Sequence, residues 1–157
     1  MKRKGDGAVA GSDLTQDEAD ALLEMDKYRV DEREHAFPTV GERTEIPLQS
    51  RDRRERFLLD LSRGRIDLAR VKYQNRARKV VVLARLELNG PSHLNPDGVE
   101  VPRPHIHIYR EGYADKWAFP LDVDRFADTG DIWRVLDDFM EYCNITQQPN
   151  IIRELFA

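Results

Sequence analysis

Apolar and polar residues alternate most regularly in the stretch from Pro104 to Tyr109. Successive side chains of a strand point to opposite faces, so this pattern predicts a strand with His105, His107 and Tyr109 on one face. Two isoleucines occupy the other face. The strand therefore combines an apolar face with a face that carries chemically reactive side chains.

A return strand is predicted from Lys116 to Leu121, after a connection with the length of a hairpin loop. If the two strands pair, the isoleucines share their face with Trp117 and Phe119, and Lys116 joins the histidines. The loop before the hairpin contains His93 and the turn sequence Asn95-Pro96-Asp97-Gly98. We expect that loop to bring His93 to the same polar surface.

Helical periodicity is found near each end of the chain. Thr15 and Glu18 have the spacing of a capping box and predict a helix start. A full apolar stripe at helical spacing runs from Ile132 to Cys143, for which Asp128 is the expected N-cap and Asn144 the expected left-handed end. A further apolar patch at helical spacing follows after Ile145.

Between these helices the pattern predicts strands at Thr44–Leu48, Arg56–Leu61, Arg65–Tyr73 and Lys79–Asn89. Pro47 places the first at a sheet edge, and apolar residues on both faces place the last in the centre. No crossover is long enough for a parallel βαβ unit. The predicted class is α+β, with an antiparallel sheet of five to six strands and an N-terminal and a C-terminal helix packed on it.

The chain of 157 residues fits one domain, expected at 14–157 after a flexible tail at 1–13. No apolar run is long enough to cross a bilayer, and the basic start has no apolar signal core, so we expect a cytoplasmic protein that does not enter membranes. Cys143, the single cysteine, lies in the helical stripe and is expected to be a core thiol.

Charge is distributed unevenly along the chain. Twelve basic and four acidic residues lie between Arg51 and Arg85, a net charge of +8, whereas the whole chain carries −4. This separation suits a polyanion such as RNA, although acidic segments that fold back onto the basic one would give the same composition. The phosphate-binding candidates are Arg63, Arg65, Arg70, Lys72, Arg76, Arg78, Lys79 and Arg110.

The candidate catalytic residues are those of the polar surface: His93, His105, His107, Tyr109 and Lys116. Two imidazoles near one phosphodiester suffice for metal-independent RNA cleavage, one as the base for the 2′-hydroxyl and one as the acid for the leaving oxygen. Lys116, Arg110 or an arginine of the basic segment would then stabilise the transition state.

Two other interpretations of the histidines stay open. His-x-His on a strand, with His93 and Asp97, has the donors of a metal site, but without a Cys pair or a His-Glu-x-x-His motif the sequence assigns no metal and no cofactor. The histidines are structural if they hydrogen-bond the preceding loop. No P-loop, Gly-x-Gly-x-x-Gly or Gly-x-Ser-x-Gly motif is present.

Several strings of the chain, among them Asn89-Gly90-Pro91-Ser92-His93-Leu94-Asn95-Pro96-Asp97-Gly98 and Pro104-His105-Ile106-His107-Ile108-Tyr109-Arg110-Glu111-Gly112, resemble a family of short bacterial proteins known as a domain of unknown function. The resemblance runs from about Leu14 to Asn144. It implies a stand-alone bacterial domain of mobile-element or defence gene neighbourhoods, and it carries no established activity over to particular residues.

The working hypothesis is a toxin-like protein that binds or cleaves RNA through the polar patch and the basic segment. The alternative, from another class, is a non-catalytic interaction or inhibitor protein that binds a protein partner.

Overall fold

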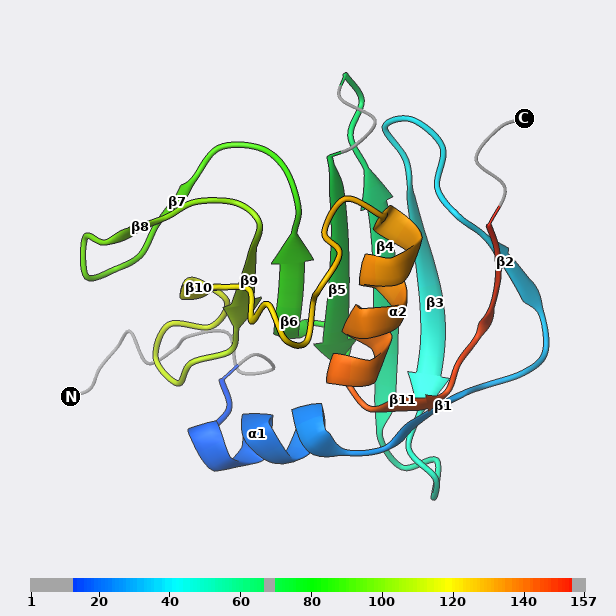
Figure 1. Cartoon of the computed structure of the whole chain (residues 1–157). Helices are drawn as coiled ribbons and strands as arrows, with labels where there is room; N and C mark the ends of the chain where they lie inside the picture. Colours follow the sequence, from blue (N-terminus) through cyan, green and yellow to red (C-terminus); the bar gives the residue numbers. More distant parts are fainter. Residues whose placement is uncertain (1–12, 67–69, 154–157) are drawn as a thin grey trace.

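The computed structural model describes residues 13–66 and 70–153 and shows an α+β fold built on one large sheet (Figure 1). No helix of this part of the chain is long and apolar enough to span a membrane. The elements are α1 (Gln16–Glu24), β1 (Lys27–Arg29), β2 (Glu34–Ala36), β3 (Arg43–Gln49), β4 (Arg56–Arg63), β5 (Val71–Ala77), β6 (Val81–Glu87), β7 (His93–Leu94), β8 (Glu100–Val101), β9 (His105–Ile108), β10 (Ala118–Pro120), α2 (Ile132–Tyr142), β11 (Ile145–Gln147) and β12 (Asn150–Ile152).

The main sheet has the strand order β10-β9-β6-β5-β4-β3-β1-β11. Its neighbouring strands are antiparallel, except that β1 pairs with β11 in parallel. Two further pairs, β12 with β2 and β7 with β8, form small sheets of their own. The α+β class is confirmed, but the predicted five to six strands become eight, because strands of three residues are too short to show a period.

Helix α2 covers one face of the sheet at β4 and β5 (Figure 1). Its stripe is buried, with Leu136, Phe139 and Met140 fully covered. They pack with Leu59, Leu61 and Tyr73 of the sheet, and the Tyr73 hydroxyl donates to the carbonyl of Ile132 at 2.9 Å. Cys143 is buried in this core, as predicted.

Both helices begin with a side-chain cap. Thr15 and Glu18 form the predicted capping box of α1. The N-cap of α2 is Asp131, whose carboxylate accepts from the amides of Trp133 and Arg134, so the prediction of Asp128 was wrong. Four aspartates precede this helix, and Asp128 instead accepts from Gly130 in the preceding turn. Asn144 adopts the predicted left-handed conformation.

Three strand predictions need correction. The strand expected at Arg65–Tyr73 begins only at Val71, and Ile66 is 95% exposed. Leu68 and residues 1–12 lie outside the described residues. Lys79 and Val80 precede β6, because Arg78 and Lys79 turn the chain with positive φ angles. Pro47 lies in a strand that is paired on both sides, although β1 reaches only the last two residues of β3.

The patch after Ile145, predicted from helical spacing, forms the short strands β11 and β12 instead of a helix. Its residues Leu155 and Phe156 are outside the described part.

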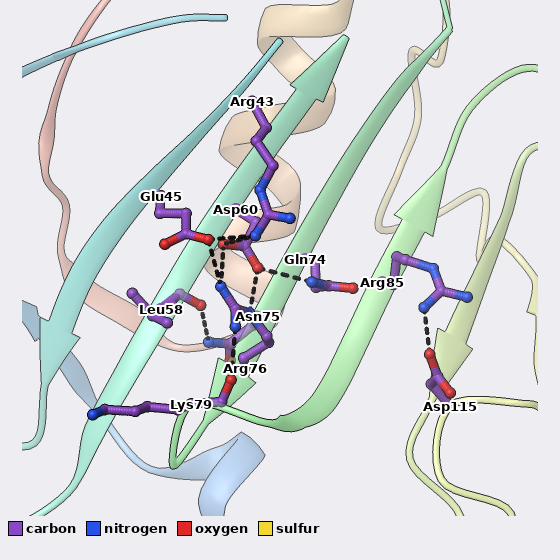
Figure 2. A network of polar contacts seen from close by, with 10 residues as sticks. All are labelled: Arg43, Glu45, Leu58, Asp60, Gln74, Asn75, Arg76, Lys79, Arg85 and Asp115. Atoms are coloured by element: carbon purple, nitrogen blue, oxygen red, sulfur yellow. Dashed lines mark hydrogen bonds and ion pairs between the residues drawn. The ribbon is translucent and has the colours of Figure 1, made fainter. Parts of the chain in front are cut away.

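The sheet face opposite α2 is polar, and we call it the polar face. It carries Asp60 of β4, Gln74 and Arg76 of β5, and Arg85 and Glu87 of β6, which alternate with the core residues of the same strands. Figure 2 shows several of these side chains with α2 on the far side of the sheet. The cross-strand pairs Arg85 with His107 and Glu87 with His105 continue this face into β9.

Candidate functional site

The three histidines predicted to lie together do so, at the β9 end of the polar face. The ring centroids of His105 and His107 are 4.9 Å apart, and that of His93 lies 4.6 Å from His107. Glu87 joins them, with its Oε1 3.2 Å from Nε2 of His105 and 3.8 Å from Nε2 of His107. We call these four residues the histidine cluster.

Backbone carbonyls hold the three rings in place. The Nδ1 atom of His105 lies 3.1 Å from the Val101 oxygen, and Nδ1 of His107 lies 2.9 Å from the Asp115 oxygen. His93 uses Nε2 in the same way, at 2.7 Å from the Lys116 oxygen. A carbonyl oxygen only accepts, so each of these ring nitrogens carries a proton. The predicted contact of Lys116 with the histidines is therefore made by its carbonyl, while its side chain is exposed.

Glu87 is the acid that the sequence interpretation missed. Arg85 donates to its Oε2 at 2.8 Å, and Arg103 lies 2.5 Å from its Oε1. Burial opposes ionisation of Glu87, but Arg85 and Arg103 together hold its pKa well below the ordinary 4.5. Burial is also the main cause that lowers the pKa of His105, against the opposing effect of Glu87. At neutral pH the cluster thus contains a carboxylate beside a neutral imidazole.

The two β9 rings of the cluster are covered. His105 is 0% and His107 2% exposed, and His93 is half-buried. The segment around β7 and β8 contributes to the closure, because His93 lies in β7 and the carbonyl that holds His105 belongs to β8. General acid-base catalysis requires contact with the substrate, and these two rings are not on the surface.

Asn95 attaches this segment to the edge strand β10. Its amide donates to the Ala118 carbonyl at 3.0 Å and accepts from the Ala118 amide at 2.9 Å, and both residues are buried. We expect Asn95→Ala to lower the free energy of unfolding by about 2 kcal/mol, since it leaves two buried backbone groups unpaired. Urea denaturation followed by circular dichroism measures the loss. Asp97→Ala is the control, because Asp97 accepts from Val99 in an exposed turn. Equal losses in the two variants would contradict the assignment.

Tyr109 does not belong to the cluster. Strand β9 ends at Ile108, and the Tyr109 ring is buried in the hydrophobic core. Its hydroxyl accepts from the amide of Leu14 at 2.8 Å and donates to the carbonyl of the same residue at 2.7 Å. Tyr109 thus holds the segment before α1. Of the predicted hairpin contacts, Phe119 pairs with Ile106 as expected, although it is 39% exposed.

Part of the predicted phosphate-binding set is bound to other side chains. Arg76 donates to Asp60 through Nε at 2.7 Å and to Glu45 at 3.1 Å (Figure 2). Arg78 pairs with Glu55 at 2.8 Å, and Arg110 lies over the ring of Trp117 at 4.3 Å. Acidic residues therefore neutralise the basic side chains at the Ala77 end of β5. This is the alternative in which acidic residues fold back onto the basic segment. The Lys79 side chain is exposed at the adjoining turn.

The other four candidates gather at the opposite end of β5. Arg63, Arg65, Arg70 and Lys72 line one hollow of about 460 Å³, together with Ser62, Gly64 and Ile66. We call it the basic hollow. Ser62 and Lys72 also line a second hollow of about 390 Å³, which extends over the polar face to Arg85 and Glu87.

Arginine side chains also meet beside the basic hollow, at Gly90. A Cβ atom added to Gly90 would lie 2.6 Å from a terminal nitrogen of Arg103 and 3.0 Å from Nε of Arg70. The φ of Gly90 is +126°, a conformation that L side chains rarely adopt. Burial lowers the pKa of Arg103, and the like charges of Arg70 and Arg85 add to this effect while Glu87 opposes it. The guanidinium groups of Arg70 and Arg103 thus bring positive charge together at Gly90, beside the basic hollow.

Comparison with curated proteins and with solved structures gave no match. A family model described as a family of unknown function, DUF6978, matches residues 14–145. This range contains both helices, the main sheet except for most of β11, the histidine cluster and the basic hollow. The chain therefore belongs to the DUF6978 family, as the resemblance of its sequence strings predicted.

Proposed function

We propose that the protein binds RNA through the basic hollow and does not cleave it. The observation that carries the proposal is the separation of the basic residues into two groups. Arg76 and Arg78 have carboxylate partners, whereas Arg65, Arg70 and Lys72 are exposed and have no ion pair among the residues that the structure describes.

Unpaired cations around a hollow are suited to bind phosphate groups. Each Lys or Arg that neutralises a phosphate releases a condensed counterion, which is the main source of sequence-independent affinity. The guanidinium groups of Arg65 and Arg70 add the geometry for two parallel hydrogen bonds to one phosphate. Arg63 contributes from the side of the hollow, where its guanidinium also lies 5.7 Å from the centre of the Phe37 ring.

The histidine cluster does not have the exposed rings that cleavage would need. His105 and His107 are covered, and their Nδ1 atoms contact backbone carbonyls. The Tyr109 hydroxyl binds the backbone of Leu14, and the Lys116 carbonyl accepts from His93. These contacts give the cluster a role in holding the β7 and β8 segment against β9 and the chain before β10.

The experiment measures the affinity of the full chain for a fluorescein-labelled single-stranded RNA by anisotropy. We expect the triple substitution Arg65→Ala, Arg70→Ala and Lys72→Ala to weaken binding at least about tenfold at moderate salt, because it removes three phosphate contacts. The matched control is Arg54→Ala, Arg56→Ala and Lys79→Ala, which removes the same charge from exposed positions elsewhere.

The remaining outcomes separate the alternatives. Equal weakening in both triple variants would reduce the effect to net charge and contradict the proposed site. Absence of binding by the unaltered chain would favour the protein-partner function. Degradation of the RNA that His105→Ala abolishes would favour the nuclease.

A further inference from the structure

The histidine cluster contains a set of ligand atoms that no role in RNA binding explains. Glu87, His105 and His107 are all buried, and one donor atom of each lies within 4.8 Å of the other two. They come from adjacent strands, since Glu87 of β6 is the cross-strand partner of His105, and His107 is two residues further along β9. Two rigid strands therefore fix all three side chains.

The ring orientation turns both Nε2 atoms toward one carboxylate oxygen. Because Nδ1 of His105 and of His107 donates to the carbonyl of Val101 and of Asp115, Nε2 is the nitrogen of each ring that is left to bind a metal ion. Both Nε2 atoms lie near Oε1 of Glu87. Three possible ligand atoms thus converge, and a metal ion would replace the proton of the hydrogen bond between Nε2 of His105 and Oε1 of Glu87.

One of these atoms has no hydrogen-bond partner. Nε2 of His107 is buried, its residue is 2% exposed, and the carboxylate oxygen at 3.8 Å is beyond hydrogen-bonding distance. Buried polar atoms are nearly always satisfied, and a cation between this nitrogen and the Glu87 carboxylate would satisfy both.

We propose that Glu87, His105 and His107 bind a zinc ion through Oε1 and the two Nε2 atoms, with water in the fourth position. Zinc bonds to nitrogen and oxygen of about 2.0–2.2 Å place neighbouring tetrahedral ligand atoms roughly 3.3–3.6 Å apart. The observed separations of 3.2 and 3.8 Å from Oε1 bracket that range. Histidines that ligate metals commonly donate their other N–H to a backbone carbonyl, as both rings do here.

Neighbouring side chains hold the Glu87 carboxylate in place. Arg85 bridges Glu87 to Asp115, and Arg103 uses one of the two lone pairs of Oε1. The hollow lined by Lys72, Arg85 and Glu87 gives an approach from solvent. His93, although its ring lies against His107, does not belong to the set of converging ligand atoms, and Asp97 belongs to the exposed turn.

Titration of the chelator-treated full chain with zinc alone tests the site by isothermal calorimetry. We expect one zinc ion per chain, an increase in melting temperature, and a dissociation constant at least about 100-fold weaker in His107→Ala. His35→Ala is the matched control, because His35 lies on the separate strand β2, and it should bind zinc as the unaltered chain does. No stoichiometric binding, or binding that both variants keep, would overturn the proposal.

Removal of a buried ring can unfold a protein, so the unaltered chain supplies a second measurement. Substitution with Co²⁺ should give the intense visible absorption of a four-coordinate site with nitrogen and oxygen ligands. The weak absorption of octahedral Co²⁺ would overturn the proposal. Because RNA binding is measured separately, failure of the zinc site leaves the basic hollow untouched.

Discussion

Replacement of Asp60 by alanine should lower the free energy of unfolding by about 3–5 kcal/mol. Asp60 is 2% exposed and accepts three hydrogen bonds, two from Arg76 at 2.7 and 2.9 Å and one from Gln74 at 2.8 Å (Figure 2). Its loss leaves a half-buried guanidinium without its main counter-charge in the middle of the sheet. Urea denaturation of the purified variant measures the change.

Two further variants show whether this loss arises from the ion pair. Glu45→Ala removes the other carboxylate that pairs with Arg76, which is on an exposed side chain. The free energy of unfolding should therefore fall by less than about 1 kcal/mol. The double variant Asp60→Leu with Arg76→Met removes both partners and should be more stable than Asp60→Ala. If Glu45→Ala were as destabilising as Asp60→Ala, the network would not depend on the buried carboxylate.

Replacement of Lys27 by methionine should cost about 2–4 kcal/mol, because it leaves three carbonyl oxygens without a donor. The Lys27 side chain is fully buried, and Nζ donates to the carbonyls of Leu23, Met25 and Cys143 at 2.8, 3.0 and 2.7 Å. Burial lowers the pKa of Lys27 to about 8, so the ammonium form still predominates at pH 7. This one side chain joins the carbonyl ends of both helices.

The same substitution at Lys79, which is exposed, gives the control and should change stability by less than about 0.5 kcal/mol. Thermal and urea unfolding of the two variants compare them directly. A Lys27→Met variant as stable as the unaltered chain would contradict the capping role.

The sequence pattern correctly predicted the part of the candidate site that lies on a single strand. Period-two alternation is sufficient to place His105 and His107 on one face. Tyr109 was placed there by the same rule, but the strand ends one residue earlier and the ring enters the core. A strand end depends on tertiary packing, which alternation does not encode.

Glu87 could not be assigned to the histidines from local sequence, because the pairing of β6 with β9 joins segments that are not consecutive strands of a hairpin. The available signal was the charged pair Arg85 and Glu87 on the otherwise apolar central strand. Charged residues on such a strand require partners, and a histidine strand is a suitable neighbour.

The basic segment shows a similar limit of composition. The net charge of +8 counts Arg76 and Lys72 alike. In the structure, however, Arg76 is paired with a carboxylate, whereas Lys72 is exposed. Asp60 lies two residues along β4 from Leu58, the cross-strand partner of Arg76, so the ion pair can be predicted only when the register of β4 and β5 is known. With that register, the predicted phosphate-binding surface is reduced to the basic hollow.

The salt dependence of RNA affinity tests the proposed function most directly. The logarithm of the association constant for single strands falls with the logarithm of salt concentration by about 0.7 for each phosphate contact. We expect the Arg65, Arg70 and Lys72 triple variant to lose about 2 from this slope, whereas the Arg54, Arg56 and Lys79 control should keep the slope of the unaltered chain. Identical slopes for all three proteins would contradict RNA binding at the basic hollow.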